Sequence, residues 1–376
     1  MCWCDSGKKR KRCHLDGPTA ATPASTSVED ASGPFSIWDA AAELRKTYSA
    51  KYCSAPSPWL KGCASQIIRA HTIPRSASLS AIARDGHVYA FNGSLEKLEK
   101  NNGRLEPELV GLKQASTFTG FCGTHDNSIF DPLESGPFVA TPEQCFLLGY
   151  RGFAREAFTK KAQYESLEIQ RKAARNLHGM KRVMTERMIE AQEASVSIAL
   201  RDHGVLKPIL DGMLMASDFS DVRAYVIEFD APPAVMCSGS INPEQDFNGA
   251  VLVDLADFKK VLEVVNVNCF YDGRAGFLVL SWLSAHDAPC KQLAESLDAV
   301  PDSQIGGALV RFMFEFFENV CISPDWWEAL SSKQRSTLVD RFLLTTDMFE
   351  PRKAHCLADD SLGLPEWQVM SRRWLN

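Results

Sequence analysis

The pattern of apolar and polar positions predicts a chain that contains both helices and strands. Apolar residues recur at helical spacing over residues 38–48, which predicts a first helix. Residues 87–91 and 116–121 form short stretches rich in β-branched and aromatic residues, and turn-forming residues surround them. We expect a strand in each of these two stretches.

The middle of the chain has a helical pattern from residue 142 to about residue 214. Thr141 is suited to cap a helix, and Pro142 is suited to its first position. Residues 163–200 are rich in Glu, Arg, Lys, Ala and Met and contain no proline, which predicts a long exposed helix. A bundle or a helical hairpin with a solvated, charged face is the alternative.

The C-terminal part alternates between strand-like and helix-like stretches. Strands are predicted for four stretches rich in β-branched and aromatic residues, at residues 222–229, 235–237, 264–271 and 276–283. A helix is expected at residues 254–261, and residues 288–343 are expected to be mainly helical. The fold class is therefore predicted to be α+β.

Composition divides the chain of 376 residues into segments, and its length predicts two or three packed units. Residues 1–17 form a compact element rich in Cys, Lys and Arg. Residues 18–34 consist largely of Pro, Ser, Thr and Ala, which predicts a flexible linker. We expect one domain over residues 35–140, a long helical segment over residues 141–220, and an α+β domain over residues 221–376.

The overall composition is that of a globular protein, with 45% hydrophobic and 23% charged residues. The net charge of -6 creates no general attraction to nucleic acid or to an anionic membrane. No apolar run approaches the ~20 residues that span a bilayer, and no apolar signal segment follows the basic N-terminus. Twelve dispersed cysteines indicate metal ligands and buried thiols rather than a disulfide framework. We therefore expect a cytoplasmic protein that does not enter membranes.

The chain opens with the motif C-W-C-D-S-G-K-K-R-K-R-C-H, which brings four soft ligands together in a short segment. Cys2 and Cys4 can bind one ion from a single turn, and Cys13 with His14 completes the set. Tetrahedral Zn²⁺ prefers this set of sulfur and nitrogen ligands in closed structural sites. So short a segment has no core, so the metal would supply its folding energy.

This motif resembles the SEC-C zinc motif, C-x-C-G-S-G-x-K-x-K-x-C-[CH], and departs from it only at Asp5. That family occurs at the C-terminus of bacterial protein-export motor ATPases and at the ends of many uncharacterised bacterial proteins. The resemblance implies a bacterial protein with a docking element rather than an active site. The basic residues 8–12 could bind phosphate or an acidic protein surface, or could only increase solubility.

A second group of candidate zinc ligands consists of Cys53, Cys63, Cys122 and His125. The Cys122-x-x-His125 spacing places two ligands across a turn or the first turn of a helix, as in treble-clef zinc elements. Cys53 and Cys63 would supply the other pair across a loop with two prolines and a glycine. Alternatively, these two cysteines are one buried and one exposed thiol. The sequence thus predicts one or two structural zinc ions.

The order of these parts resembles the HNH, or ββα-metal, nuclease family. The segment A-H-T-I-P-R-S matches the family segment that carries the general-base histidine, here His71. Cys122 and His125 match the second structural ligand pair, and Asp126 falls where a ligand of the catalytic metal is expected. The resemblance implies a treble-clef, HNH-like zinc domain over residues 35–140.

The resemblance also implies a chemistry for these residues. A neutral His71 could deprotonate an attacking water, and Asp126 could help to hold Mg²⁺ or another divalent ion. Arg75 could bind a phosphate through its guanidinium. The family's middle Asn is absent, and Ala70 replaces the usual acidic or histidine neighbour. A treble clef that kept its zinc and lost its chemistry is therefore the alternative.

Two functional hypotheses follow from the sequence. The first is an HNH-like metal-dependent endonuclease, or a nuclease-derived protein that binds nucleic acid. The second is a non-catalytic adaptor, in which zinc elements and the long helix make contacts with other proteins.

Overall fold

The computed structural model falls into two units, Met1–Phe35 and Ser36–Asn376, and the second is described below. The residues that the structure describes are 35–93, 97, 101, 104–255, 257, 259–346 and 352–375. Cys2, Cys4, Cys13, His14 and the predicted linker lie outside these residues. Within them, no helix is both long enough and apolar enough to cross a membrane.

The described part is a mixed α+β structure, which confirms the predicted fold class at that level. Its helices are α1 (Ile37–Tyr48), η2 (Ser57–Gly62), η3 (Arg75–Leu79), α2 (Ser80–Ile82), α4 (Gly123–Glu134), α5 (Pro142–Ala174), α6 (Gly179–Ala216), η4 (Ser284–His286), α7 (Asp287–Asp298), α8 (Asp302–Phe316), α9 (Pro324–Ala329) and α10 (Ser332–Thr346). Its strands are β1 (Ile67–His71), β2 (His87–Phe91), β3 (Pro107–Gly111), β4 (Thr117–Cys122), β5 (Val222–Phe229), β6 (Val235–Ile241), β7 (Val265–Tyr271), β8 (Gly276–Leu283), β9 (Val320–Ile322) and β10 (Val369–Leu375).

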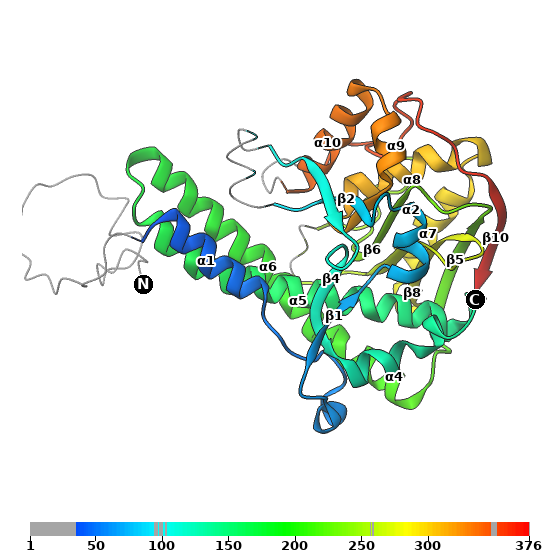
Figure 1. Cartoon of the computed structure of the whole chain (residues 1–376), viewed down its shortest axis with the longest axis horizontal. Helices are drawn as coiled ribbons and strands as arrows, with labels where there is room; N and C mark the ends of the chain where they lie inside the picture. Colours follow the sequence, from blue (N-terminus) through cyan, green and yellow to red (C-terminus); the bar gives the residue numbers. More distant parts are fainter. Residues whose placement is uncertain are drawn as a thin grey trace, which may run out of the picture. The chain divides into compact units, whose positions relative to one another are not determined.

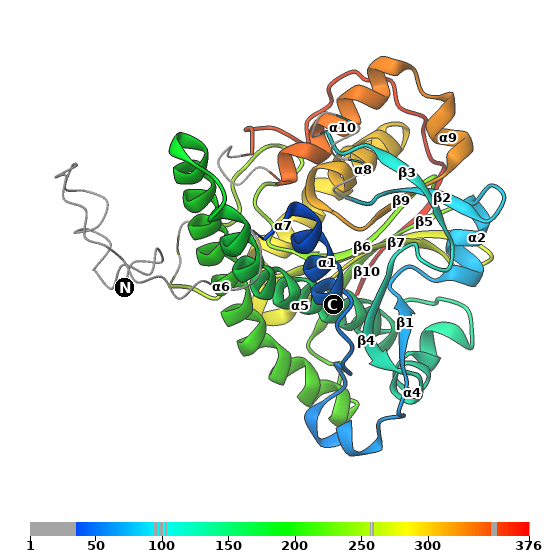
Figure 2. The ribbon, with the colours of Figure 1, turned by 60° about the vertical axis from the view of Figure 1, so that its left-hand side comes forward.

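An eight-stranded antiparallel sheet forms the centre, in the order β10-β5-β8-β7-β6-β9-β2-β3 (Figures 1 and 2). Alternate residues of β5 point into different cores: Tyr225 packs in a core that includes residues of α7 and α8, and Val226 packs in a core that includes α5. Both faces are thus covered, which explains why β5 and β8 are apolar almost throughout.

Helix α5 lies close against the sheet because it presents glycines to it. A Cβ atom at Gly149 would lie 2.7 Å from the Asn266 side-chain nitrogen of β7, so a larger residue would force the helix away. The Ser281 hydroxyl of β8 donates to the carbonyl of Cys145 on α5, at 3.2 Å. These contacts fix α5 as the element that joins the large sheet to the smaller sheet described next.

A second sheet consists of β1 and β4, which pair antiparallel and are followed by helix α4. Ile67 pairs with Cys122 at one end of this sheet, and His71 pairs with Thr117 at the other. The residues between β1 and β4 include β2 and β3, which join the large sheet. The large sheet therefore combines strands from residues 87–111 with strands from the C-terminal part of the chain.

Most predicted elements are confirmed, because local periodicity and capping determine them. The predicted strands at residues 87–91, 222–229 and 276–283 match β2, β5 and β8. Thr141 caps α5, since its side chain accepts a hydrogen bond from the Gln144 N–H at 3.1 Å. The helix predicted at residues 254–261 is wrong, since the described residues of that stretch are turns and irregular chain.

The long helix predicted over residues 163–200 is a hairpin of two helices. Helix α5 ends at Ala174, and α6 begins at Gly179, whose φ of 59° favours a residue without a side chain. Leu167, Ala174 and Ile189 pack together near the turn and hold the two helices side by side. The hairpin alternative is therefore the correct one.

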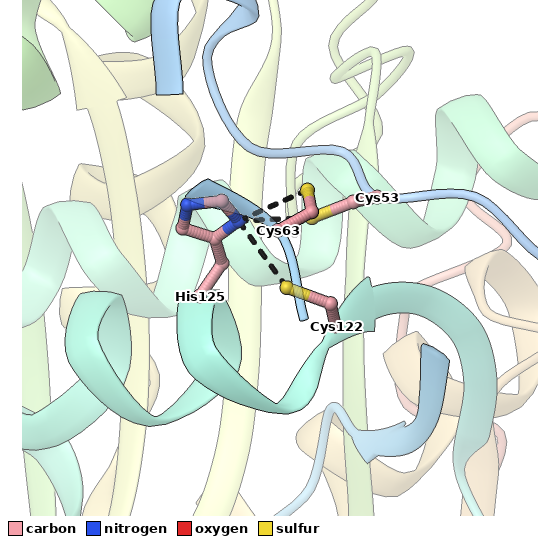
Figure 3. Close-up of side chains that lie close together, drawn as sticks. All are labelled: Cys53, Cys63, Cys122 and His125. Atoms are coloured by element: carbon pink, nitrogen blue, oxygen red, sulfur yellow. Dashed lines mark hydrogen bonds between the residues drawn. The ribbon is translucent and has the colours of Figure 1, made fainter. Parts of the chain in front are cut away.

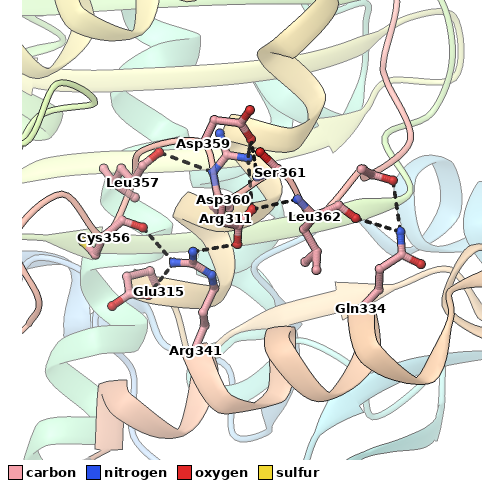
Figure 4. A network of polar contacts seen from close by, with 11 residues as sticks. Arg311, Glu315, Gln334, Arg341, Cys356, Leu357, Asp359, Asp360, Ser361 and Leu362 are labelled. Carbon is pink, nitrogen blue, oxygen red and sulfur yellow. Dashed lines mark hydrogen bonds and ion pairs between the residues drawn. The ribbon is translucent and has the colours of Figure 1, made fainter.

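Two arginines, Arg311, which is buried, and Arg341, which is half-buried, hold the segment that leads to β10 in place (Figure 4). Arg341 of α10 lies 3.2 Å from the carboxylate of Glu315, donates to the Cys356 carbonyl at 2.7 Å and pairs with Asp360 at 2.8 Å. Arg311 of α8 donates to the Leu357 carbonyl at 3.3 Å. These side chains satisfy backbone carbonyls of a segment that has no regular hydrogen bonding of its own.

Replacing Arg341 with alanine should loosen this segment. The change removes charge-assisted hydrogen bonds that stabilise the closed segment by about 2 kcal/mol relative to its locally open state. Amide exchange over residues 356–362 should therefore accelerate roughly thirtyfold. Hydrogen exchange followed by mass spectrometry measures this effect. The Arg335→Ala variant, on the same helix, is the control; equal acceleration in both variants would contradict the assignment.

Candidate metal centre

Four side chains from three parts of the chain meet at one end of the β1–β4 sheet. Cys53 and Cys63 flank η2, Cys122 is the last residue of β4, and His125 lies in the first turn of α4. Their ligand atoms all lie within 4.8 Å of one another (Figure 3). The structure thus brings together the second set of candidate ligands that the sequence singled out.

Local sequence explains how each ligand reaches the site. Cys122 caps α4, so the three-residue spacing to His125 directs both side chains to the same point at the start of the helix. Pro56 precedes η2 and fixes the start of a 3-10 turn, which returns the chain from Cys53 to Cys63. Trp59 of this turn lies over His125, with 6.5 Å between the ring centres.

The distances fit a single ion at the centre of the four ligands. The Nδ1 atom of His125 lies 3.4 Å from the sulfurs of Cys53 and Cys63 and 3.3 Å from that of Cys122. Tetrahedral zinc with ordinary bond lengths places nitrogen and sulfur ligands about 3.6 Å apart. One imidazole nitrogen has a single proton or lone pair, so it cannot bond to three sulfurs at once. A shared metal ion accounts for all three contacts.

The electrostatics of the cysteines also favour a cation. Burial and the neighbouring sulfurs of Cys53 and Cys122 raise the pKa of Cys63 to about 12. Burial acts to raise the pKa of Cys122, but hydrogen bonds to its sulfur from the N–H groups of His125 and Ala64 and from Cys53 and Cys63 together outweigh burial, and its pKa is lowered. Three thiolates at this spacing repel one another unless a positive ion lies between them. The cluster could therefore hold a metal ion such as zinc.

His71 lies at the opposite end of β1 from this cluster. Its Nε2–H donates to the carbonyl of Leu112 at 2.9 Å, which fixes the tautomer and leaves the lone pair on Nδ1. Burial lowers the pKa of His71, and the charges of Arg75 and Arg151 lower it further, against the opposing effects of the Leu112 carbonyl and Glu134. His71 is therefore neutral at pH 7 and able to accept a proton.

Asp126 is buried in the first turn of α4, where it faces an arginine. Arg151 of α5 is only 3% exposed and lies 3.8 Å from the Asp126 carboxylate and 2.7 Å from that of Glu134. Its guanidinium also lies over the ring of Phe130, 3.8 Å from the centroid. Burial raises the pKa of Asp126 even though Arg151 acts to lower it. One oxygen of Asp126 has no hydrogen-bond partner.

Arg151 and Glu134 are functional candidates that the sequence interpretation missed. A signal was present, because Arg151 is a charged residue within the otherwise apolar stretch F-L-L-G-Y-R-G-F of α5. The charges of both residues act on His71 and on Asp126. Asp126, Glu134 and Arg151 form a polar cluster, which we call the acid–arginine cluster. Arg75 is exposed nearby, at the start of η3.

No family model, no curated protein and no solved structure matches this chain.

Proposed function

We propose that this protein is a zinc-binding protein with an HNH-like unit, and that this unit makes it a metal-dependent endonuclease or a nuclease-derived protein that binds nucleic acid. One observation carries the proposal: three sulfurs surround one imidazole nitrogen at 3.3–3.4 Å, directly beside a two-stranded sheet and a helix. In this proposal zinc joins the loop of Cys53 and Cys63 to the junction of β4 and α4.

The order of elements supports the HNH-like assignment. Two ligands precede β1, the candidate base ends β1, and the second ligand pair joins β4 to α4. The family has this order of structural ligands, base and helix. The inserted hairpin of β2 and β3 distinguishes this chain, because it extends the connection between the two strands into the large sheet.

In the catalytic form of the proposal, His71 removes a proton from water. Its Nδ1 carries the free lone pair, and its lowered pKa keeps the imidazole neutral. Asp126, with one unbonded oxygen, would be a ligand of a divalent ion that stabilises charge on the phosphate. Arg75 is exposed and would bind the phosphate itself.

A specific observation favours the second candidate, a non-catalytic adaptor. Arg151 already offers a positive charge to Asp126 and is itself buried. A divalent ion at Asp126 would lie close to this guanidinium, and the two like charges would repel each other. In the adaptor the acid–arginine cluster only ties α4 to α5, and the surfaces around it bind a partner.

A nuclease assay separates the two candidates. We test single- and double-stranded substrates in Mg²⁺ and expect the wild-type protein to cleave nucleic acid. The His71→Ala variant should lose about 10²–10⁴-fold in rate, as for removal of a general base. The His178→Ala variant, at an exposed histidine before α6, is the matched control and should retain full activity. Cleavage that persists in His71→Ala would exclude His71 as the base, and absence of cleavage by purified wild type would favour the adaptor.

A further inference from the structure

Two hollows adjoin where the β2–β3 hairpin meets η3. The large hollow has a volume of about 880 Å³, and the small hollow has a volume of about 230 Å³. Asn92, Val110 and Gln114 line both of them. Because they share these lining residues, the two hollows are neighbours. The large hollow has the size of an ordinary ligand site.

The large hollow carries positive charge that no described acidic residue neutralises. Arg75 and Lys113 line it and are both exposed, and no ion pair of either is found among the described residues. Glu108, the acidic residue among its described lining residues, is paired with Lys97. In a chain of net charge -6, two uncompensated cations in one hollow indicate an anionic ligand.

The small hollow is lined mainly by polar groups that donate or accept hydrogen bonds. They include the side chains of Gln114, Thr117 and Asn319, the donor Arg155 and the acceptor Glu318. Donors and acceptors of this kind read the edges of unpaired nucleobases. The hollow is smaller than an ordinary ligand site, so it suits a single ring rather than a whole nucleotide.

The walls of both hollows are hydrogen-bonded to the end of β1, where the candidate base lies, or to the residue that follows it. Leu112 lines the large hollow, and its carbonyl accepts the hydrogen bond from His71. Ser116 and Asn319 line the small hollow, and their side chains lie 2.6 Å and 2.8 Å from the Thr72 hydroxyl. The adjacent residues His71 and Thr72 thus contact the wall of one hollow each.

We propose that the two hollows form one groove for single-stranded nucleic acid, with backbone phosphates on Arg75 and Lys113 and one base in the small hollow. A single strand can turn a base out of its stack and into such a hollow, whereas a paired base in a duplex cannot enter it. The inference rests on the proposed function, because it supplies the substrate on which His71 would act.

Fluorescence anisotropy tests the groove with the full-length, zinc-loaded protein and a labelled single-stranded oligonucleotide of mixed sequence, without added Mg²⁺. The double variant Arg75→Ala, Lys113→Ala should bind about tenfold or more weakly. It should also flatten the logarithmic salt dependence by about 1.4, since two phosphate contacts are lost at about 0.7 each. The double variant Lys181→Ala, Arg187→Ala makes the same charge change on exposed residues of α6 and should bind like wild type.

Several results would overturn the groove. They are wild-type affinity in the Arg75→Ala, Lys113→Ala variant, an equal loss of affinity in the α6 control, and tighter binding of a duplex of the same sequence. Displacement of the strand by inorganic phosphate at constant ionic strength would also overturn it, because the site would then recognise only a free anion. The expected result is that inorganic phosphate competes weakly and an unlabelled single strand competes fully.

The groove and the catalytic proposal fail in different ways. If the wild-type protein binds through Arg75 and Lys113 but does not cleave in Mg²⁺, the groove is supported and the catalytic proposal is contradicted. If cleavage requires His71 but binding does not depend on Arg75 and Lys113, the catalytic proposal is supported and the groove is contradicted.

Discussion

Replacing Cys122 with serine should remove one zinc ion per chain and lower the midpoint of thermal unfolding by at least about 5 °C. Cys122 is the ligand on which both halves of the site depend, because it ends β4, caps α4 and lies 3.3 Å from His125 Nδ1. Without it, the ion loses a thiolate that belongs to a buried strand. The loop of Cys53 and Cys63 then loses its attachment to the rest of the unit.

Elemental analysis of purified protein measures the first part of this expectation. If the SEC-C-like motif also binds zinc, wild type contains two ions, and both the Cys122→Ser variant and a deletion of residues 1–17 contain one. The Cys145→Ser variant is the matched control, since Cys145 is equally buried on α5 but lies outside the cluster. It should retain the wild-type zinc content.

The opposite outcome is equally informative. A Cys122→Ser variant with unchanged zinc content and unchanged melting would mean that the four side chains do not hold an ion. The HNH-like assignment would then lose its structural basis. A single zinc ion that disappears only with residues 1–17 would lead to the same conclusion.

Replacing Arg151 with methionine should destabilise the fold by about 3–5 kcal/mol. Methionine retains much of the side-chain volume but removes the charge that lies between Asp126 and Glu134. Asp126 is buried, so it is left as an uncompensated carboxylate or must take up a proton. The packing of the guanidinium on Phe130 is lost as well.

The loss should depend on pH in a defined direction. A carboxyl whose folded pKa lies above its unfolded value binds its proton more tightly when folded, so stability falls as pH rises through the interval between the two values. Asp126 already has a raised pKa, and removal of Arg151 raises it further. The loss in free energy of unfolding of the Arg151→Met variant, relative to wild type, should therefore grow from mildly acidic to neutral pH.

Urea unfolding at mildly acidic pH and at neutral pH measures the effect. The double variant Asp126→Asn, Arg151→Met should recover much of the stability at neutral pH, because no charge remains to be buried at that position. Arg274→Met is the control: Arg274 is 64% exposed and pairs with Asp272 at 3.6 Å, so its loss should cost about 0–1 kcal/mol. A pH-independent loss would show that packing, rather than charge, makes Arg151 important.

The candidate site could be predicted in part because some of its chemistry is local. Cys122 and His125 are three residues apart across a helix cap, so their spacing alone directs them to one point. Arg151 and Asp126 are 25 residues apart in the sequence, and no periodic pattern indicates that they lie close together. The sequence interpretation assigned Asp126 to a metal, whereas the structure gives it a buried arginine as a neighbour.

The sequence by itself determined the elements whose causes are short-range: the apolar strands β5 and β8, the Thr141 cap of α5 and the turn residues around β2. Only the tertiary structure decided which strands share a sheet, where α5 and α6 separate, and which residues line the two hollows. The physical reason is range. Periodicity and capping act within a few residues, whereas sheet order and buried ion pairs depend on packing between segments that are distant in the chain.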